Sequence, residues 1–565
     1  MKPGLRYGGG ATSYMTLTVF LIGLVASRAT AQEALTLDAT AGDSIIARFN
    51  AAATVRMFGD AAMPAGVVVD GDVAVLAGTL DLAGHVRGTV VVINGVLQLR
   101  AGAVVDGDVI VTGGTIQGLA DARIGGSTRL YPEALRYHRE ADRITAVGER
   151  IAGQVSAGRE FRYGRSELRA AVEGSYNRVE GLPIGLGGRL VLGRGNPTQL
   201  SARLIYRTAS GLRLDPDELG YHVGLAQSIG GARGARFTAA LRSEITPIET
   251  EGLTGREASL ATFLLHRDYR DHFERVGWSI GLGLAPRSWA TRLAAEYRDE
   301  RHDRVAPESP WSVFDNNEPW RPQPAAAAGR LRTIALRYGF DSRNEEVMPS
   351  SGWLVDLELE RALDVDLELP TTTAEGPFAQ RPALQTFTAA TLDMRRYARL
   401  GRRSRLATRV WAAGALSDGP LPPQRQHALG GEGTLPAYPL FGFSCGARRA
   451  AILLDEVPFF PHYGCDRAVL VQLEHDATLP LGDVLRGAFG GNVDLSDAAG
   501  WIVFFDAGRA WSEDAVGDGR TRGQGDFAAE AGLGVRLGRL GAYWAFPLTG
   551  GGETANFFIR LDRRF

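Results

Sequence analysis

One pentapeptide has the residue types of a nucleophilic catalytic site. Gly442–Gly446 reads GFSCG and matches the G-x-S-x-G elbow that presents a serine in hydrolases. His462 and His475 follow it and could act as bases. The elbow needs a strand before the serine and a helix after it, in a chain of alternating β and α elements. The surrounding sequence shows strands and loops, so we expect small residues in a compact loop and not a serine hydrolase.

Acidic residues suggest two further kinds of chemistry. Glu474 and Asp506 could form the carboxylate pair that glycoside hydrolysis requires. The acids of two VDGDV repeats could bind calcium, although aspartates in turns more often bond to the local backbone. The chain has no H-E-x-x-H, no Walker loop and no dinucleotide-binding motif placed between a strand and a helix. We therefore expect no enzymatic activity, no cofactor and no metal site.

The N-terminus has the pattern of a secretory signal peptide. Lys2 and Arg6 precede the apolar run Met15–Ala26, and an A-x-A site ends at Ala31. We predict cleavage there, so that residues 1–31 are removed. The alternative, an uncleaved membrane anchor, is disfavoured because the apolar run is too short to cross about 30 Å of hydrocarbon.

The two cysteines are expected to pair. Cys445 and Cys465 are the only cysteines, and export places them in an oxidising compartment. Their spacing fits no zinc site. A disulfide that closes one loop is the prediction, and two free thiols are the alternative.

Composition limits the class of protein. The chain has 565 residues, with 62 Lys and Arg against 64 Asp and Glu, so its net charge is -2. A nucleic-acid-binding protein usually has a basic excess, so we expect no nucleic-acid partner. The 72 glycines indicate many turns, and the length indicates more than one domain.

A short repeat follows the signal peptide. VDGDV occurs at Val69–Val73 and at Val105–Val109, and glycines recur about every 18 residues at positions 71, 88, 107 and 126. Short apolar strands between glycine corners predict a β-solenoid. The repeat resembles the bactofilin type of β-helix. We assign residues 32–129 to this solenoid, and the charged residues 130–165 to a linker that could hold a short helix.

From Ser166 to the end, the chain is a series of alternating segments. In WLVDLELERAL, Trp353, Val355 and Leu357 lie on one face, and the acids lie on the other. This pattern predicts half-buried strands. A soluble sandwich or propeller would bury the apolar face, whereas a membrane barrel turns it to lipid. The signal peptide and the long loops favour the barrel, and 400 residues allow about 14–18 strands.

Five phrases, in order, resemble the BamA/TamA family of outer-membrane barrels. The clearest are FDSRNEEVMPSSGW at Phe340–Trp353, FFDAGRAW at Phe504–Trp511 and the final FFIRLDRRF. The resemblance implies a barrel of 16 strands over residues 166–565 and a role in protein insertion or translocation. It also implies that HALGGEGTLPAYPLFGF is a loop folded into the lumen.

The loop departs from the family pattern. The family places an arginine at the loop tip, which pairs with acids on the barrel wall. Here the tip reads Leu435-Pro436-Ala437-Tyr438; Tyr438 matches, but the arginine is absent. The acids implied by the resemblance, Glu474 and Asp506, remain, and buried carboxylates without a cation are costly. We predict that Arg448 or Arg449 replaces the missing arginine; the alternative is a water-filled lumen with no such pair.

The chain end is predicted to be the closing strand. Its apolar residues share one face, and a terminal aromatic residue resembles the sorting signal of bacterial outer-membrane barrels: Phe557, Ile559, Leu561 and Phe565. Arg563 lies on the same face, so we expect it near the headgroups on the periplasmic side, where a charge costs about 0–1 kcal/mol.

The sequence as a whole predicts an all-β protein with a 16-stranded antiparallel transmembrane β-barrel preceded by a small β-solenoid. We place the barrel in the outer membrane and the N-terminal domain in the periplasm. Expected partners are outer-membrane lipids, the machinery that inserts the barrel, and client proteins or further copies that bind through the solenoid. The family has client-receiving POTRA domains before its barrel, and this chain has solenoid and linker instead. The alternative function is therefore a structural anchor that links a self-associating β-helix to the membrane.

Overall fold

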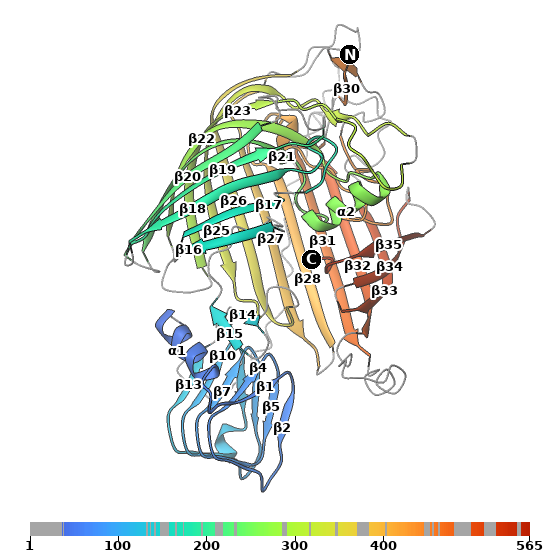
Figure 1. Cartoon of the computed structure of the whole chain (residues 1–565). Coiled ribbons are helices and arrows are strands. Elements are labelled where there is room, and N and C mark those ends of the chain that lie inside the picture. The colour runs from blue at the N-terminus through green and yellow to red at the C-terminus, as the bar shows by residue number, and fades with distance from the viewer. Residues whose placement is uncertain are drawn as a thin grey trace, which may run out of the picture.

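A computed structural model describes most of the chain (Figure 1). It covers residues 37–565 apart from 38, 132–133, 136, 141–142, 147–157, 164–165, 173–174, 194–195, 210–218, 231–233, 285–290, 316–317, 345–348, 370–383, 402–403, 446–451, 455–456, 461–463, 480–498, 513–526, 539 and 551–554. The predicted signal peptide and Arg448 and Arg449 therefore lie outside the described residues. No helix in the described part of the chain is long and apolar enough to cross a membrane.

The N-terminal part is a β-solenoid of parallel strands. Its first sheet comprises β1 (Val55–Phe58), β4 (Val73–Leu76), β7 (Val90–Ile93), β10 (Val109–Thr112) and β13 (Thr128–Tyr131). The second comprises β2 (Ala61–Met63), β5 (Thr79–Leu82), β8 (Val96–Leu99) and β11 (Thr115–Gln117). The third comprises β3 (Val68–Val69), β6 (His85–Val86), β9 (Val104–Val105) and β12 (Arg123–Ile124), with a 3-10 turn at Leu119–Asp121.

The periodic glycines sit where successive coils touch. A Cβ on Gly88 would lie 2.5 Å from the carbonyl oxygen of Gly71, and one on Gly107 would lie 2.7 Å from that of Gly88. Real Cβ atoms do not come this close to backbone, so only glycine fits these corners. The repeat read from the sequence thus follows from the stacking of the coils.

The three central strands of the first sheet, β4, β7 and β10, are buried on both faces. Val75 and Val92 point into the solenoid core, whereas Ala74 and Val91 pack outward against helix α1 (Ala39–Phe49). A hairpin of β14 (Tyr137–Glu140) and β15 (Arg143–Ala146) covers the same outer face through Ile144. Burial on both faces explains why these strands read as continuous apolar runs and not as alternating ones.

The C-terminal part is one antiparallel sheet of 17 described strands that curves into a barrel (Figure 1). In order these are β16 (Gly158–Tyr163), β17 (Ser166–Val172), β18 (Ile184–Leu192), β19 (Thr198–Tyr206), β20 (Leu219–Ile229), β21 (Ala235–Pro247), β22 (His272–Leu284), β23 (Thr291–Asp303), β25 (Ala328–Asp341), β26 (Gly352–Glu368), β27 (Thr388–Arg399), β28 (Ser404–Ala415), β31 (Arg467–Thr478), β32 (Ala499–Trp511), β33 (Ala528–Leu537), β34 (Leu540–Pro547) and β35 (Asn556–Arg560). The predicted fold class is confirmed, with one strand beyond the expected 16.

The extra strand changes the expected domain boundary. Residues 130–165 were predicted to be a linker with a short helix, but in the structure β16 already belongs to the barrel sheet and β14 pairs with β15. The linker prediction was therefore wrong for these strands. The sequence did not indicate this hairpin, because its two strands have only four residues each and are rich in charged residues.

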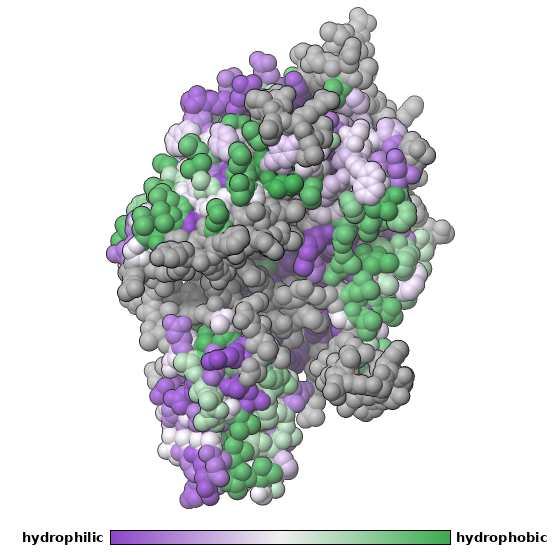
Figure 2. Space-filling view, viewed as in Figure 1, coloured by the Kyte–Doolittle hydropathy of each residue, from purple (hydrophilic) through white to green (hydrophobic). Residues whose placement is uncertain are grey.

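The outside of the barrel carries an apolar belt. Large apolar side chains on strands β18–β35 are exposed on the outer face, as the green regions of the wall in Figure 2 show; examples are Leu186, Leu225, Ile280, Leu336, Val503 and Leu533. On the same strands, arginines and acids point inward and are buried, such as Arg409, Glu360 and Asp506. Apolar outside and polar inside is the arrangement that a barrel needs in lipid.

Loops at the end away from the solenoid fold over and into the barrel. One carries α2 (Gly255–Leu265), which begins with a capping box formed by Thr254 and Glu257. Another loop holds a 3-10 turn at Pro423–Arg425 and the strands β29 (Ile452–Leu454) and β30 (Val457–Phe460), with which β24 (Gln323–Pro324) pairs. Buried Arg178, in the loop before β18, pairs with Asp268 and Asp271 of the α2 loop and donates to the Pro322 carbonyl beside β24.

The solenoid contacts the barrel through the corners of its coils. Asn94 has a buried side chain whose Nδ2 donates to the carbonyls of Leu135 and, at 2.6 Å, Asn344 in a barrel turn. Its Oδ1 accepts from the Leu135 N–H. Arg399 of the barrel donates to the Ala77 carbonyl at 3.5 Å. A side-chain amide with both ends satisfied fixes the solenoid against the barrel end.

The Asn94 contact gives a testable expectation. Asn94→Ala should leave the Leu135 N–H and the Asn344 carbonyl without partners, at a cost of about 1–3 kcal/mol for each group. Limited proteolysis of the folded chain should then separate the solenoid from the barrel faster than in the unchanged protein. Asn94→Asp is the matched control, because it keeps an acceptor for Leu135 and should lie between the two. Equal cleavage rates for all three proteins would contradict the contact.

Candidate functional site in the barrel lumen

The long loop 416–466 enters the barrel and is closed by a disulfide. Cys445 and Cys465 are bonded, with Cα atoms 4.8 Å apart. His427 and Cys465 exchange two backbone hydrogen bonds beside this link. Burial lowers the pKa of His427 to about 4, so the ring is neutral above that pH. The described part of the loop is therefore held in a fixed fold beside this link.

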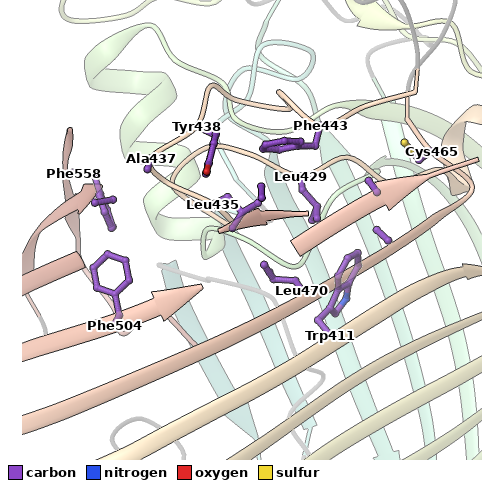
Figure 3. Close-up of a cluster of buried hydrophobic side chains, with 14 of the residues drawn as sticks. Trp411, Leu429, Leu435, Ala437, Tyr438, Phe443, Cys465, Leu470, Phe504 and Phe558 are labelled. Carbon is purple, nitrogen blue, oxygen red and sulfur yellow. The ribbon is translucent and has the colours of Figure 1, made fainter. Parts of the chain in front are cut away.

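The tip of this loop is anchored by its backbone. Figure 3 shows the tip residues packed over strands of the barrel wall. The Ala437 N–H donates to Glu530 Oε2 at 2.7 Å, and the Pro436 carbonyl accepts from Asn556 at 2.7 Å. The Tyr438 hydroxyl donates to the Ala529 carbonyl at 2.8 Å. A backbone N–H of the tip thus donates a hydrogen bond to one of the carboxylates on the barrel wall.

Apolar packing completes the seat of the tip. The loop contributes Leu429, Leu435 and Phe443, and the wall contributes Trp411, Leu470, Phe504, Tyr543 and Phe558, all buried in one cluster. The ring of Tyr438 meets that of Phe443 edge-on at 5.0 Å. Burying an aromatic ring contributes about 1.5–3 kcal/mol, so this cluster holds the loop inside.

A group of buried carboxylates lies beneath the tip. Glu474 on β31, Asp506 on β32 and Glu530 on β33 point into the lumen, and each is at most 3% exposed. Asp506 and Glu530 are direct partners in the register of β32 and β33. Three close acids would repel one another strongly unless cations balance them.

The balancing cation comes from the end of the chain. Arg564 pairs with Asp506, and its Nη1 lies 4.0 Å from Glu474 Oε2. The guanidinium also stacks over the ring of Phe504, with its central carbon 3.8 Å from the ring centre. Arg564 is 3% exposed. It therefore occupies the position for which Arg448 or Arg449 was predicted.

Neighbouring arginines extend this network toward the solenoid end. Asp476 pairs with Arg563 of the chain end and with Arg536 at 3.0 Å. Arg405 lies 3.3 Å from the same carboxylate and 3.7 Å from Glu474. The inner wall of β31–β33 thus holds a mixed group of acids and arginines, two of which come from the last three residues.

Helix α2 turns the chain end inward. Glu257 accepts two bonds from Arg560, at 2.7 and 3.0 Å, and further bonds from the N–H groups of Leu561 and Asp562. Arg256 pairs with Asp562 at 3.1 Å. Strand β35 ends at Arg560 because the next two backbone donors bond to a helix carboxylate and not to another strand.

These contacts correct the expected course of the terminus. Phe557, Ile559 and Leu561 are exposed on the outer face, as the alternation implies. Arg563 was expected on the same lipid-facing side, but it pairs with Asp476 inside, so that expectation was wrong. Phe565 follows the turn and is half-buried. Figure 1 accordingly places the C-terminus within the outline of the barrel.

Among the described residues, Ser444 and His475, which were considered for chemistry, do not lie together. Ser444 is buried in the loop, whereas His475 faces outward from β31 and packs against Trp501. His462 lies outside the described residues. In the solenoid, Asp70 pairs with Arg87 and Asp108 accepts from Ser127, which are contacts of turns between coils. The described residues hold no cluster of His, Cys, Asp and Glu that could bind a metal.

The sequence missed two members of the lumen group. Leu533, Val535 and Leu537 alternate along the same strand and leave Glu530 on the opposite face, so it could have been placed with Asp506 on the inner face. For Arg564 the alternation implied only an inward direction. Nothing in the local sequence indicated that the strand would end at Arg560 or which acids Arg564 would meet.

A buried loop carboxyl outside the strands makes folding sensitive to pH. Burial raises the pKa of Glu180, in loop 173–183, to about 7. A raised pKa means that the folded chain binds this proton more tightly than the unfolded chain does. The contribution of Glu180 to the free energy of unfolding is therefore largest below about pH 4.5 and is lost as the pH rises through 7. At about 1.4 kcal/mol for each pH unit, the loss approaches about 3 kcal/mol.

Glu180→Gln should therefore remove this pH dependence. Urea unfolding of the folded barrel in micelles, followed at pH 5 and pH 8, should show a smaller difference for the variant than for the unchanged protein. Glu308→Gln, at an exposed glutamate in another loop, is the control. An identical difference in both variants would exclude Glu180 as the source.

Comparison with known proteins gives similarity in structure only. No family model and no curated protein matches the sequence. Among solved structures, the chain is similar to BamA from Haemophilus ducreyi lacking POTRA domains 1-3, with a TM-score of 0.43 and 13% identity, over 72% of this chain and 74% of that one. It is also similar to CdiB from Escherichia coli, with a TM-score of 0.32 and 10% identity, over 73% of this chain and 67% of that one.

Proposed function

We propose that this chain is an outer-membrane β-barrel that inserts or translocates proteins. The apolar belt outside and the buried charges inside support a place in a bilayer. The predicted signal peptide supports export, with the solenoid on the periplasmic side. The residues described ahead of the barrel form a helix, a solenoid and a hairpin, and these elements offer the surface on which a client would be received.

The observation that carries this proposal is the unpaired seam. Among the described residues, β16 bonds only to β17 and β35 bonds only to β34. Within the described strands, the two ends of the sheet therefore do not close on each other by hydrogen bonds. An unpaired strand edge is a template on which another chain can add a strand. A barrel with such an edge at the level of the membrane could accept a strand of a client protein.

Depletion of the protein tests the proposal directly. If the chain inserts other barrels, quantitative proteomics of the outer membrane should show their loss after depletion. Photo-crosslinkers at Phe557 and Ile559 of β35 should capture client chains, whereas one at Leu225 of β20 serves as the matched control on the far wall. An unchanged outer-membrane proteome would refute the proposal.

A second candidate function is anchoring, and the first coil of the solenoid favours it. Strands β1, β2 and β3 each bond on one side only among the described residues. Val55, Val67 and Val68 are exposed on this coil. Such an edge could bond to the solenoid of a second copy, so that the barrel holds a row of solenoids at the membrane.

Oligomer size distinguishes the anchor from the insertase. Val68→Lys places a charge on the exposed edge, which opposes strand pairing. If copies associate there, light scattering of the full chain in micelles should show a smaller particle for the variant. An insertase without this association should show no change in size, while its depletion phenotype remains.

A further inference from the structure

We propose that the last five residues, Leu561–Phe565, form an internal latch that holds the loop tip and helix α2 in the closed lumen. The inference concerns how the interior is held and does not rest on the proposed function. The tail follows β35, which is one of the two ends of the sheet that are unpaired among the described strands.

The tail is held by side chains and not by a strand ladder. Beyond Arg560 its bonds go to Glu257 on α2, to Asp476 on β31 and to Asp506 on β32. The described strand pairing ends before Leu561. The tail can therefore leave its seat without breaking hydrogen bonds of the sheet. Its departure requires that the ion pairs of Arg563 and Arg564 separate, that the bonds of Leu561 and Asp562 to helix α2 break and that Arg564 leaves the ring of Phe504.

The seat is a specific site for a guanidinium group. Arg564 lies between Glu474, Asp506 and the face of Phe504, so that it has two carboxylates at its edge and an aromatic ring below. A planar cation suits this geometry better than an ammonium group. The loop tip itself supplies no cation, because it reads Leu435-Pro436-Ala437-Tyr438.

The latch is coupled to the loop through one carboxylate pair. Asp506 binds Arg564, and its register partner Glu530 binds the Ala437 N–H of the loop tip. When Arg564 leaves, the two neighbouring acids lose their cation and repel each other. The bond from Ala437 to Glu530 is then weakened. Movement of the tail is thereby transmitted to the tip of loop 416–466.

The latch is coupled to helix α2 in a similar way. Glu257 accepts from Leu561 and Asp562, and Arg256 and Thr254 bond to the Asp562 carboxylate. Three residues at the start of α2 thus contact the tail. The tail, the loop tip and α2 form one connected set, of which the tail is the member at the end of the chain.

Labelling of the chain end tests the latch. The two native cysteines are bonded to each other, so Phe565→Cys would give the folded chain one reactive thiol. In protein refolded into micelles, a charged maleimide should react slowly with this thiol. Adding Arg563→Gln and Arg564→Gln should raise the rate at least tenfold. Arg396→Gln, an arginine beside Trp353 on the outer wall, is the matched control and should leave the rate unchanged.

A variant that fails to fold must be distinguished from a folded variant in which the tail has left its seat. Heat-dependent migration on gels should report whether each variant forms the barrel. If the two arginine substitutions prevent folding, Asp476→Asn and Asp506→Asn are added, because each removes the charge of an acid that has lost an arginine partner. Faster labelling in the folded variant supports the latch. A labelling rate equal to that of Phe565→Cys alone, in a barrel that folds, would overturn it.

Discussion

Arg564→Ala is expected to lower the free energy of unfolding of the barrel by about 3–5 kcal/mol. The substitution leaves Asp506 buried without its cation and removes one of the two arginines beside Glu474, and both acids are at most 3% exposed. It also removes the guanidinium that stacks on Phe504. Urea unfolding in micelles, followed by tryptophan fluorescence, measures the change.

The cost of the unpaired buried charge can be distinguished from the cost of the lost packing of the Arg564 side chain. Asp506→Asn in the Arg564→Ala background removes the unpaired charge and should restore a large part of the stability. Arg301→Ala is the control for a general loss of an arginine, since that side chain is 73% exposed and pairs with Asp303 on the outer surface. It should cost at most about 1 kcal/mol. A loss as large as that of Arg564→Ala would refute the explanation from burial.

Glu257→Ala should destabilise the closed arrangement by a similar amount, about 3–5 kcal/mol. It leaves Arg560, which is 1% exposed, without its carboxylate, and it removes the acceptor for the N–H groups of Leu561 and Asp562. It also breaks the capping box at Thr254. Hydrogen exchange should show loss of protection at Leu561 and Asp562 first.

The ionisation of Glu257 adds a pH dependence to this prediction. Burial acts to raise the pKa of Glu257, but the Arg560 guanidinium and the backbone donors outweigh burial and hold the pKa below its usual range. A lowered pKa stabilises the fold above about pH 4.5, and this stability is lost as the pH falls. Glu257→Gln should therefore reduce the acid sensitivity of exchange at Leu561. If the acid sensitivity stayed the same, another group would be responsible.

Part of the fold follows from local pattern. The alternation in WLVDLELERAL correctly placed Trp353 and Leu357 outside, because successive side chains of a strand point to opposite faces whatever the partner strand is. The glycine period correctly indicated the coils, since contact between coils excludes a Cβ. The linker prediction failed because β14–β16 are too short and too charged to show a period.

The sequence predicted two acids and the disulfide of the candidate site but not its cation. Glu474 and Asp506 were placed in the lumen by their alternation, and the structure brings them together across adjacent strands β31 and β32. The position of the two cysteines in one loop made their pairing a natural expectation, and the structure has them bonded. The cation could not be identified in the same way, because any arginine on a flexible segment could reach a buried acid.

The sequence alone therefore determined the faces of the strands, the coils of the solenoid and the acids of the lumen, since each depends on spacing within a few residues. The tertiary structure alone decided which cation meets those acids and where the last strand stops. Both depend on residues as distant as Glu257 and Arg560, or Asp506 and Arg564, whose separation in space is set by the curvature of the whole sheet. Contacts of that kind leave no period in the sequence, because each partner is free to vary as long as the barrel brings an acid and an arginine together.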